Sequence, residues 1–298
     1  MTAEKILQLE QGAIAFQEYG DPQGRPVVFC HGWPSSRTMA ELTDTAAREL
    51  GVRIISPDRP GISRSDLPPE RRLLDWPPVV RALADYLGLD RFRILAISGG
   101  APYAYVSAWL MPERVAAIAV VSGAPPIQEL RDHAGLLPLY RWMLALYDKQ
   151  PKLLRLCFHA VRPFACIRPP VRFRPLLLKL LQPVDALSLR DSAAFEACFE
   201  SQRRAWRGSA DGVMADAQIH ADAWGFALEE ISVPVRLWHG TKDRSFSIGI
   251  AEEVASRLPH CTARYIEAAG HYSLPIRYMR EILHDLMATE QEAAPPGL

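Results

Sequence analysis

The stretch RILAISGGAPYAYVSAWL, residues 93–110, carries the strongest indication of the fold in this chain. Its first five residues form an apolar run typical of a buried strand, and Gly99, Gly100 and Pro102 open a helix directly afterwards. Ser98 stands between them, in the strand, sharp turn and helix context that exposes a nucleophile above a parallel sheet. Small neighbours permit the turn, and the helix N-terminus favours negative charge there. We predict that Ser98 is a nucleophile; the alternative is a glycine-rich turn with an N-cap serine.

Apolar runs alternate with helical patterns around this stretch, which predicts a mostly parallel sheet covered by helices on both faces. Besides residues 93–97, the expected strands are KILQL (5–9), IAFQEY (14–19), PVVFCH (26–31), VRIISP (52–57), VAAIAVV (115–121), VPVRLWHG (233–240) and TARYIEA (262–268). The expected helices lie at about 36–50, 75–88, 99–111, 248–258 and 275–288. Asp75 is the expected N-cap of the second helix, with Pro77 in its first turn.

The strand pattern vanishes between residues 126 and 225, where leucine, arginine, proline and aromatic residues dominate. This composition predicts a helical cap interrupted by prolines. We therefore expect one α/β core, formed by residues 1–125 and 226–290, with the cap inserted between its parts. The tail, residues 291–298, has turn formers and no apolar periodicity, and we expect it to be disordered.

Composition excludes several classes of function. The 34 basic and 34 acidic residues balance, so no global field attracts nucleic acid. Five scattered cysteines without a C-x-x-C pair and eight histidines without ligand spacing predict no metal site. The start of the chain has no apolar signal segment and no stretch is long enough to cross a membrane, so we expect a soluble, cytoplasmic protein without stable membrane insertion. The oligomeric state stays open.

Two further strand ends carry the residues that would activate Ser98. Asp243 lies in GTKDRSF after the strand at 233–240, and His271 lies in EAAGHYSLP after the last strand. Catalytic groups of open α/β sheets gather at the edge formed by the carboxyl ends of the strands. Ser, Asp, His is the chain order in which α/β sheets with a nucleophile on a strand-to-helix turn carry a triad. We predict that His271 is the general base and that Asp243 orients it.

The segment FCHGWPSSR, residues 29–37, ends the third strand with a His31-Gly32 turn. This turn would bring the Trp33 N–H to the crevice at the strand ends, where it would form an oxyanion hole with the Gly99 N–H. The Trp33 side chain is either one wall of an acyl pocket or a packing residue, and the sequence leaves both open.

Together these segments closely resemble the α/β-hydrolase fold superfamily, specifically its serine hydrolases with the elbow S-G-G-x-P-Y-A, here Ser98 to Ala104. HGWPSSR, SPDRPGISRSD, WHGTKD and GHYSLP share the likeness, which covers nearly the whole chain. The resemblance implies an eight-stranded, mostly parallel sheet, a lid after strand six and no cofactor. The departures are Ala96 for the first elbow glycine and Ser63 where a second glycine often follows strand four.

Two other features of the sequence invite a catalytic role, but a structural one is favoured. Asp58 and Arg59 lie at a strand end, and in this fold that segment tends to brace the oxyanion loop. His239 lies close to Gly240, but histidines at strand ends commonly bond to the backbone. None of the three is included in the catalytic set.

The resulting hypothesis is a serine hydrolase that cleaves a carboxylic ester, thioester or lactone of a small to medium apolar molecule through an acyl-enzyme. Amidases, C–C hydrolases and acyltransferases use the same triad, and a weakly catalytic ligand-binding protein is a further alternative. The cap sequence VRFRPLLLKLL, residues 171–181, mixes basic and apolar residues as interfacial helices do. The prolines that interrupt the cap sequence favour packing as a lid instead.

Overall fold

The computed structural model describes residues 3–10, 12–68 and 70–289, and the tail expected to be disordered, residues 291–298, lies outside this range. Eight strands form one sheet in the order β1-β2-β4-β3-β5-β6-β7-β8. They are β1 (Lys5–Leu9), β2 (Gly12–Gly20), β3 (Arg25–Cys30), β4 (Val52–Pro57), β5 (Phe92–Ile97), β6 (Val115–Val121), β7 (Val235–Gly240) and β8 (Cys261–Ile266). β2 runs antiparallel to β1 and β4, and every other pair is parallel. The predicted mostly parallel, eight-stranded α/β sheet is confirmed.

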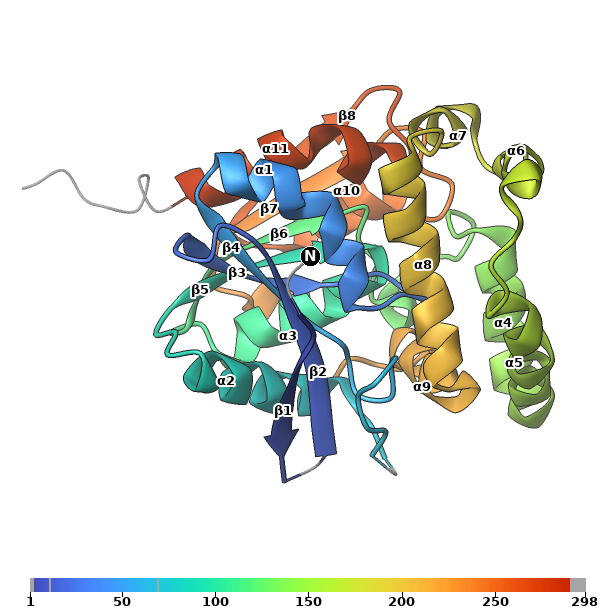
Figure 1. Ribbon diagram of the computed structural model, residues 1–298, viewed down its shortest axis with the longest axis horizontal. Coiled ribbons are helices and arrows are strands. Elements are labelled where there is room, and N and C mark those ends of the chain that lie inside the picture. Colours follow the sequence, from blue (N-terminus) through green and yellow to red (C-terminus); the bar gives the residue numbers. More distant parts are fainter. Residues whose placement is uncertain (1–2, 11, 69, 290–298) are drawn as a thin grey trace, which may run out of the picture.

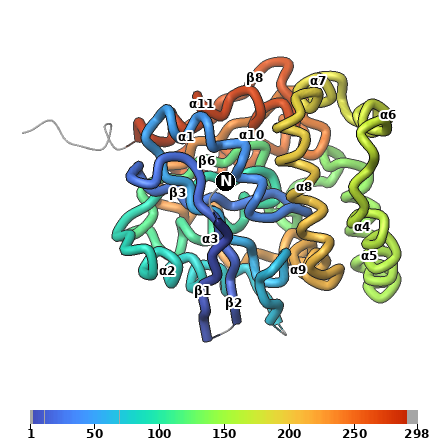
Figure 2. The backbone as a smooth tube through the Cα atoms, viewed as in Figure 1, coloured from blue at the N-terminus to red at the C-terminus, as the bar shows by residue number. Residues whose placement is uncertain are grey.

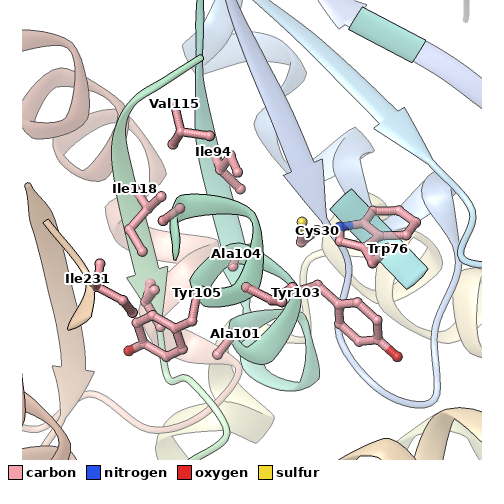
Figure 3. Packing of buried hydrophobic residues seen from close by; sticks show 14 of the residues in the cluster. Cys30, Trp76, Ile94, Ala101, Tyr103, Ala104, Tyr105, Val115, Ile118 and Ile231 are labelled. Carbon is pink, nitrogen blue, oxygen red and sulfur yellow. The ribbon is translucent and has the colours of Figure 1, made fainter. Parts of the chain in front are cut away.

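Helices cover both faces of the sheet (Figure 1). α1 (Asp44–Glu49) and α11 (Ser273–Ala288) pack on one face, and α2 (Trp76–Tyr86), α3 (Ala101–Leu110) and α10 (Ile248–Arg257) on the other. The central strand β5 is buried along its whole length because it lies between two such layers. In Figure 3 the first turns of α3, with Ala101, Tyr103 and Tyr105, lie beside Ile94 of β5 and Ile118 of β6. This packing fixes the turn that carries Ser98.

Asp75 occupies the N-cap position of α2, as predicted, but its side chain makes no cap hydrogen bond to that helix. Asp75 has helical backbone angles, φ −80° and ψ −10°, and its carboxylate accepts from the backbone N–H of Arg72 at 2.8 Å. Its carboxylate therefore caps the 3-10 turn Leu73–Asp75, which directly precedes α2. Pro77 lies in the first turn of α2, as expected.

Six helices fill the chain between β6 and β7 and form the cap: α4 (Pro138–Lys149), α5 (Pro151–Ala165), α6 (Arg174–Leu178), α7 (Pro183–Ser188), α8 (Ser192–Gly208) and α9 (Ala210–Ala221). In α4 to α7 a proline occupies the first turn, so prolines start these helices more often than they interrupt one; Pro163 is inside α5. α8 packs on the 3-10 turn Arg37–Thr43, whereas α4, α5 and α6 lie at the outer edge of the molecule (Figure 2).

Candidate active site

Ser98 occupies the sharp turn between β5 and α3. Its φ is 52°, a left-handed value that a non-glycine residue adopts only when the surroundings enforce it. The neighbouring Gly100 is required by packing, because a Cβ there would lie 2.1 Å from the carbonyl oxygen of Cys30. Ala96, which stands where such turns often have glycine, fits in the fully buried strand β5. The turn thus holds the Ser98 hydroxyl at the carboxyl edge of the sheet.

The structure brings His271 and Asp243 to Ser98 from the loops after β8 and β7. His271 Nε2 lies 2.9 Å from Ser98 Oγ, and its Nδ1 lies 2.7 Å from Asp243 Oδ2. A carboxylate only accepts hydrogen bonds, so Nδ1 carries the proton and Nε2 is free to accept one. Asp243 also accepts from the backbone N–H groups of Ser245 and Phe246, at 2.7 and 3.2 Å, which fixes its orientation.

Electrostatics at this site favour the charged pair. Burial lowers the pKa of His271, but the Asp243 carboxylate, its hydrogen bond and the charge of Asp185 outweigh burial, and the net pKa is raised. Burial raises the pKa of Asp243, but the charge and hydrogen bond of His271 outweigh it and lower that pKa. Asp243 is therefore ionised and His271 is a stronger base than an ordinary histidine.

The backbones of Trp33 and Gly99 lie side by side next to Ser98. A Cβ on Gly99 would lie 2.9 Å from the Trp33 amide nitrogen and 2.6 Å from the Trp33 Cβ, so only glycine permits this approach. Gly32 borders the same spot, since a Cβ there would be 3.6 Å from Ser98 Cβ. The two amides predicted to form an oxyanion hole are thus adjacent.

A buried ion-pair network braces this loop. Arg59 donates to the carbonyl oxygens of His31 and Gly32, at 2.5 and 2.8 Å, and pairs with Asp216 of α9 at 2.6 Å. Arg71 pairs with the same carboxylate at 2.7 Å.

The neighbouring Asp58 forms a second buried ion pair. It accepts from the backbone N–H of Arg37 at 2.6 Å and pairs with the Arg37 guanidinium. Both residues of the Asp58–Arg59 segment therefore have structural contacts, and Asp216 links the cap to the loop.

Asp185 of the cap is a contact that sequence reasoning missed. Its buried carboxylate accepts from the backbone N–H groups of His271, Tyr272 and Ser273, at 3.2, 3.0 and 2.7 Å. These N–H groups lie at the N-terminus of helix α11, a position that favours negative charge. Gly270 makes room, because a Cβ there would be 2.6 Å from Asp185 Oδ1. A cap residue thus holds the loop that carries His271, and no local motif marks a bond across 86 residues.

An apolar cavity opens above Ser98, Gly99 and Trp33, between the sheet edge and the cap. Its cap wall consists mainly of apolar and aromatic side chains, among them Tyr140, Met143, Leu144, Leu154, Met214 and Ala217. Trp33 lines the cavity and also packs: its indole N–H donates to the Val213 carbonyl at 2.9 Å, and its ring contacts Phe158. Trp33 therefore lines the cavity and packs against the cap at the same time.

His220 of α9 is a polar exception in this cavity. Neither of its ring nitrogens has a hydrogen-bond partner among the described residues. Burial, together with the guanidiniums of Arg59 and Arg71, outweighs the attraction of Asp216 and lowers the pKa of His220 to about 4. Its neutral ring lies beside the oxyanion loop, since a Cβ on Gly99 would be 3.1 Å from His220 Nε2.

His239 has the structural role that the sequence favoured. Its Nε2 lies 3.0 Å from the carbonyl oxygen of Phe246, in the loop that holds Asp243.

The five cysteines are all free and form no disulfide bond. Within residues 3–10, 12–68 and 70–289, no group of three or more His, Cys, Asp or Glu is placed to hold a metal ion.

Solved structures of other proteins align with this structure over nearly the whole chain. An esterase from Exiguobacterium antarcticum aligns with a TM-score of 0.69 at 18% identity, over 97% of this chain and 100% of that one. The structure titled "Est816 as an N-Acyl homoserine lactone degrading enzyme" aligns with a TM-score of 0.67 at 21% identity, over 94% and 99%. At these identities the likeness shows the fold.

Curated relatives and a family model complete the comparison. The chain is 35% identical over 121 residues to a non-heme chloroperoxidase of Streptomyces lividans, a match to 40% of this chain and 44% of that protein. It is 24% identical to the uncharacterized hydrolase YcgS of Bacillus subtilis (strain 168) over 276 residues, 90% and 91% of the two chains. The family model of the alpha/beta hydrolase fold matches residues 25–277. Because this match spans most of the chain, the protein belongs to the α/β-hydrolase fold family.

Proposed function

We propose that this protein is a serine hydrolase that cleaves carboxylic esters, including thioesters or lactones, of small to medium apolar acyl groups. The observation that carries the proposal is the chain of contacts from Ser98 Oγ through His271 to Asp243, at 2.9 and 2.7 Å, beneath an apolar cavity. A nucleophile, a base and an orienting carboxylate at hydrogen-bond distances are the requirements of acyl transfer.

In the first half of the reaction, Ser98 Oγ attacks the ester carbonyl carbon while His271 Nε2 takes the hydroxyl proton. Asp243 stabilises the resulting imidazolium through the Nδ1 bond. The negative charge that develops on the carbonyl oxygen would be held by the Trp33 and Gly99 N–H groups, and losing one such donor typically costs about 2.7–4 kcal/mol. The C–O bond then breaks and His271 returns its proton to the leaving oxygen, which leaves an acyl group on Ser98.

In the second half, water attacks the acyl carbon, gives its proton to His271, and releases the acid as Ser98 regains its hydrogen. The leaving oxygen must lie near His271 Nε2, because that nitrogen protonates it. A second, smaller hollow beside Ser98 contains His271, Tyr272 and Met39, whereas the larger cavity does not include His271. The leaving group therefore belongs in the smaller hollow and the acyl chain in the larger one.

Other acyl-transfer reactions fit the same three residues. An amidase, a C–C hydrolase or an acyltransferase differs in the leaving group or in the acceptor, and a ligand-binding protein of this fold would lack turnover. Esters are the first choice because the cavity wall is predominantly apolar, with few groups to bind a charged or highly polar substrate.

Labelling and turnover test the proposal together. A fluorophosphonate should modify Ser98 alone, because that hydroxyl has a base beside it. Ser98→Ala should retain the fold but lose about 10³-fold or more in kcat/KM on p-nitrophenyl butanoate. Ser107→Ala, at a serine elsewhere on α3, is the control that should keep activity. Normal turnover in folded Ser98→Ala, or an adduct that maps to another serine, would rule the proposal out.

A further inference from the structure

The outer side of the cap exposes large apolar side chains to an unusual degree. Among the described residues, twelve of the seventeen exposed large hydrophobics lie between residues 138 and 190. The most exposed of them are Leu180 at 82%, Val171 at 81%, Phe164 at 76% and Leu156 at 63%. Scattered single residues of this kind are ordinary on protein surfaces, but a concentration in one region marks an interaction site.

Helix α5 has two apolar faces. Leu154 and Phe158, four residues apart, are buried against Trp206 and Met214 and so attach the helix to the rest of the cap. Leu153, Leu156 and Phe164 lie on another face at helical spacing and are exposed. A helix that only roofs a cavity needs one apolar face, so the second stripe is unexplained by the cap's packing.

The following segment repeats this arrangement. Of the apolar residues in 171–181, Leu178 is buried, but Val171, Leu176 and Leu180 are exposed. Lid packing, which the prolines of the cap favour, therefore accounts for only some of the apolar residues in this segment. α4 and α5 pack on each other, and in the view of Figures 1 and 2 α4, α5 and α6 all lie along the edge of the molecule away from the sheet.

The same region is strongly basic. Residues 138–190 contain ten Lys or Arg and two Asp or Glu, in a chain whose total charge is zero. One of the two acids, Asp185, is buried against the loop of His271, which leaves Asp148 as the exposed one. Lys152 and Lys179 are exposed among the apolar residues of α5 and of the segment after α6. The rest of the chain carries the balancing negative charge, so the protein has a positive cap and a negative body.

We propose that the outer face of α4, α5 and α6 binds the surface of an anionic phospholipid bilayer, with Phe164, Val171 and Leu180 inserted among the lipid headgroups. Basic residues interleaved with Leu, Phe and Trp are the composition of segments that lie in a membrane interface. Lysines and arginines add attraction to anionic lipid. No described helix is long and apolar enough to cross a bilayer, so the association is peripheral.

The charge also separates this occupant from a second copy of the chain. Two such faces brought together would oppose cation to cation, because Asp148 is the exposed acid of residues 138–190 and the neighbouring Asp211 and Glu196 already pair with Arg155 and Arg168. A bilayer with anionic headgroups satisfies both features of the surface at once. α4 and α5 also contribute Tyr140, Met143 and Leu154 to the cavity, so the helices that would lie on lipid form its wall.

Vesicle partitioning of the full chain tests the proposal. The protein should bind vesicles of phosphatidylcholine with one third phosphatidylglycerol at least about tenfold more tightly than vesicles of phosphatidylcholine alone, and high salt should abolish the difference. Trp142 of α4, 52% exposed, is the one exposed tryptophan of the seven. Its fluorescence should be quenched by brominated lipid, and Trp142→Phe should remove that quenching.

Two double variants separate the apolar and charged contributions. Phe164→Ser with Leu180→Ser, and Lys152→Glu with Lys179→Glu, should each weaken binding to anionic vesicles about tenfold or more. The matched controls lie outside the cap: Tyr86→Ser with Leu110→Ser, and Arg81→Glu with Arg280→Glu, should bind as the unaltered protein does. Hydrolysis of p-nitrophenyl butanoate should be unchanged in all four, which verifies folding.

Three outcomes would overturn the proposal. The first is equal binding to both kinds of vesicle, and the second is no binding to either. The third is a stable dimer in sedimentation velocity that Phe164→Ser with Leu180→Ser dissociates, because a second copy would then cover this face. Vesicle binding does not depend on turnover, so these outcomes are distinct from a failure of the proposed hydrolase activity.

Discussion

The α/β core and the cap contribute to the site in different ways. In the core, Ser98, His271 and Asp243 come from three loops at one sheet edge, and His271 contacts both of the other two directly. The cap reaches the same loops with single carboxylates, Asp185 on the His271 loop and Asp216 on Arg59. The core therefore supplies the three side chains of the candidate site, whereas the cap holds the His271 loop and Arg59 through hydrogen bonds and ion pairs.

The two regions also differ in how they bury apolar surface. Core strands such as β5 and β6 lie between helical layers and are almost completely buried. The cap has one thin layer, and α4 has no fully buried residue among its twelve. A thin layer cannot hide two apolar faces, so its outer face is left to solvent or to a partner.

The largest effect on stability should follow from removal of the ion pair between Asp216 of the cap and the arginines of the core. Asp216→Asn leaves the guanidiniums of Arg59 and Arg71 buried without their counter-charge. Removing one member of a buried ion pair typically costs about 3–5 kcal/mol. We expect the free energy of unfolding, measured by urea denaturation, to fall by that amount.

Asp211→Asn is the matched control on the same helix. Asp211 pairs with Arg155 at 2.8 Å on the surface, where such pairs are worth less than about 1 kcal/mol. If the two variants were equally stable, the cap would not be anchored to the core through Asp216.

The second prediction concerns pH and the loop held by Asp185. The raised pKa of His271 means that kcat/KM should rise with pH around a midpoint above the ordinary histidine value of about 6.5, as the ring becomes neutral. Asp185→Asn removes a negative charge that favours the imidazolium, so the midpoint should move to lower pH. It also weakens three backbone contacts of the loop, and kcat/KM at the plateau should fall about tenfold.

Asp191→Asn separates this effect from a general loss of charge in the cap. Asp191 caps helix α8 and lies away from the His271 loop, so its variant should keep the native midpoint. An Asp185→Asn enzyme with an unchanged pH profile would show that the cap does not tune the base.

The smallest effect, again on stability, should follow from replacement of His220. Its unpaired ring in an apolar cavity costs stability, so His220→Leu should raise the free energy of unfolding at neutral pH by about 1 kcal/mol. Because the folded pKa is lowered to about 4, the native protein should lose stability as pH falls from about 6.5 to about 4, and the variant should lose less.

His284→Leu is the corresponding control, since His284 is exposed on α11 and its variant should change stability by less than about 0.5 kcal/mol. A destabilised His220→Leu protein would indicate that the ring makes contacts in the fold that outweigh its missing partners.

Much of the core could be predicted from the sequence because its signals are local. An apolar run between turn residues marks each strand, and the chain order of Ser98, Asp243 and His271 places them at strand ends. Parallel strands share their carboxyl edge, so such residues meet without any knowledge of side-chain packing. The start of α2 was predicted correctly, but the 3-10 turn that precedes it leaves no mark in the apolar pattern.

Local sequence patterns predict the sheet, the insertion after β6 and the positions of the three residues at the sheet edge, because each depends on residues close together in the chain. The contacts of Asp185 with the His271 loop, of Asp216 with Arg59 across 157 residues, and the unpaired position of His220 in the cavity become visible in the folded chain alone. The folded chain also decides which apolar residues of the cap face outward. These features depend on how six short helices pack on one another and on the core, and amphipathic helices with two apolar faces do not specify that packing by pattern alone.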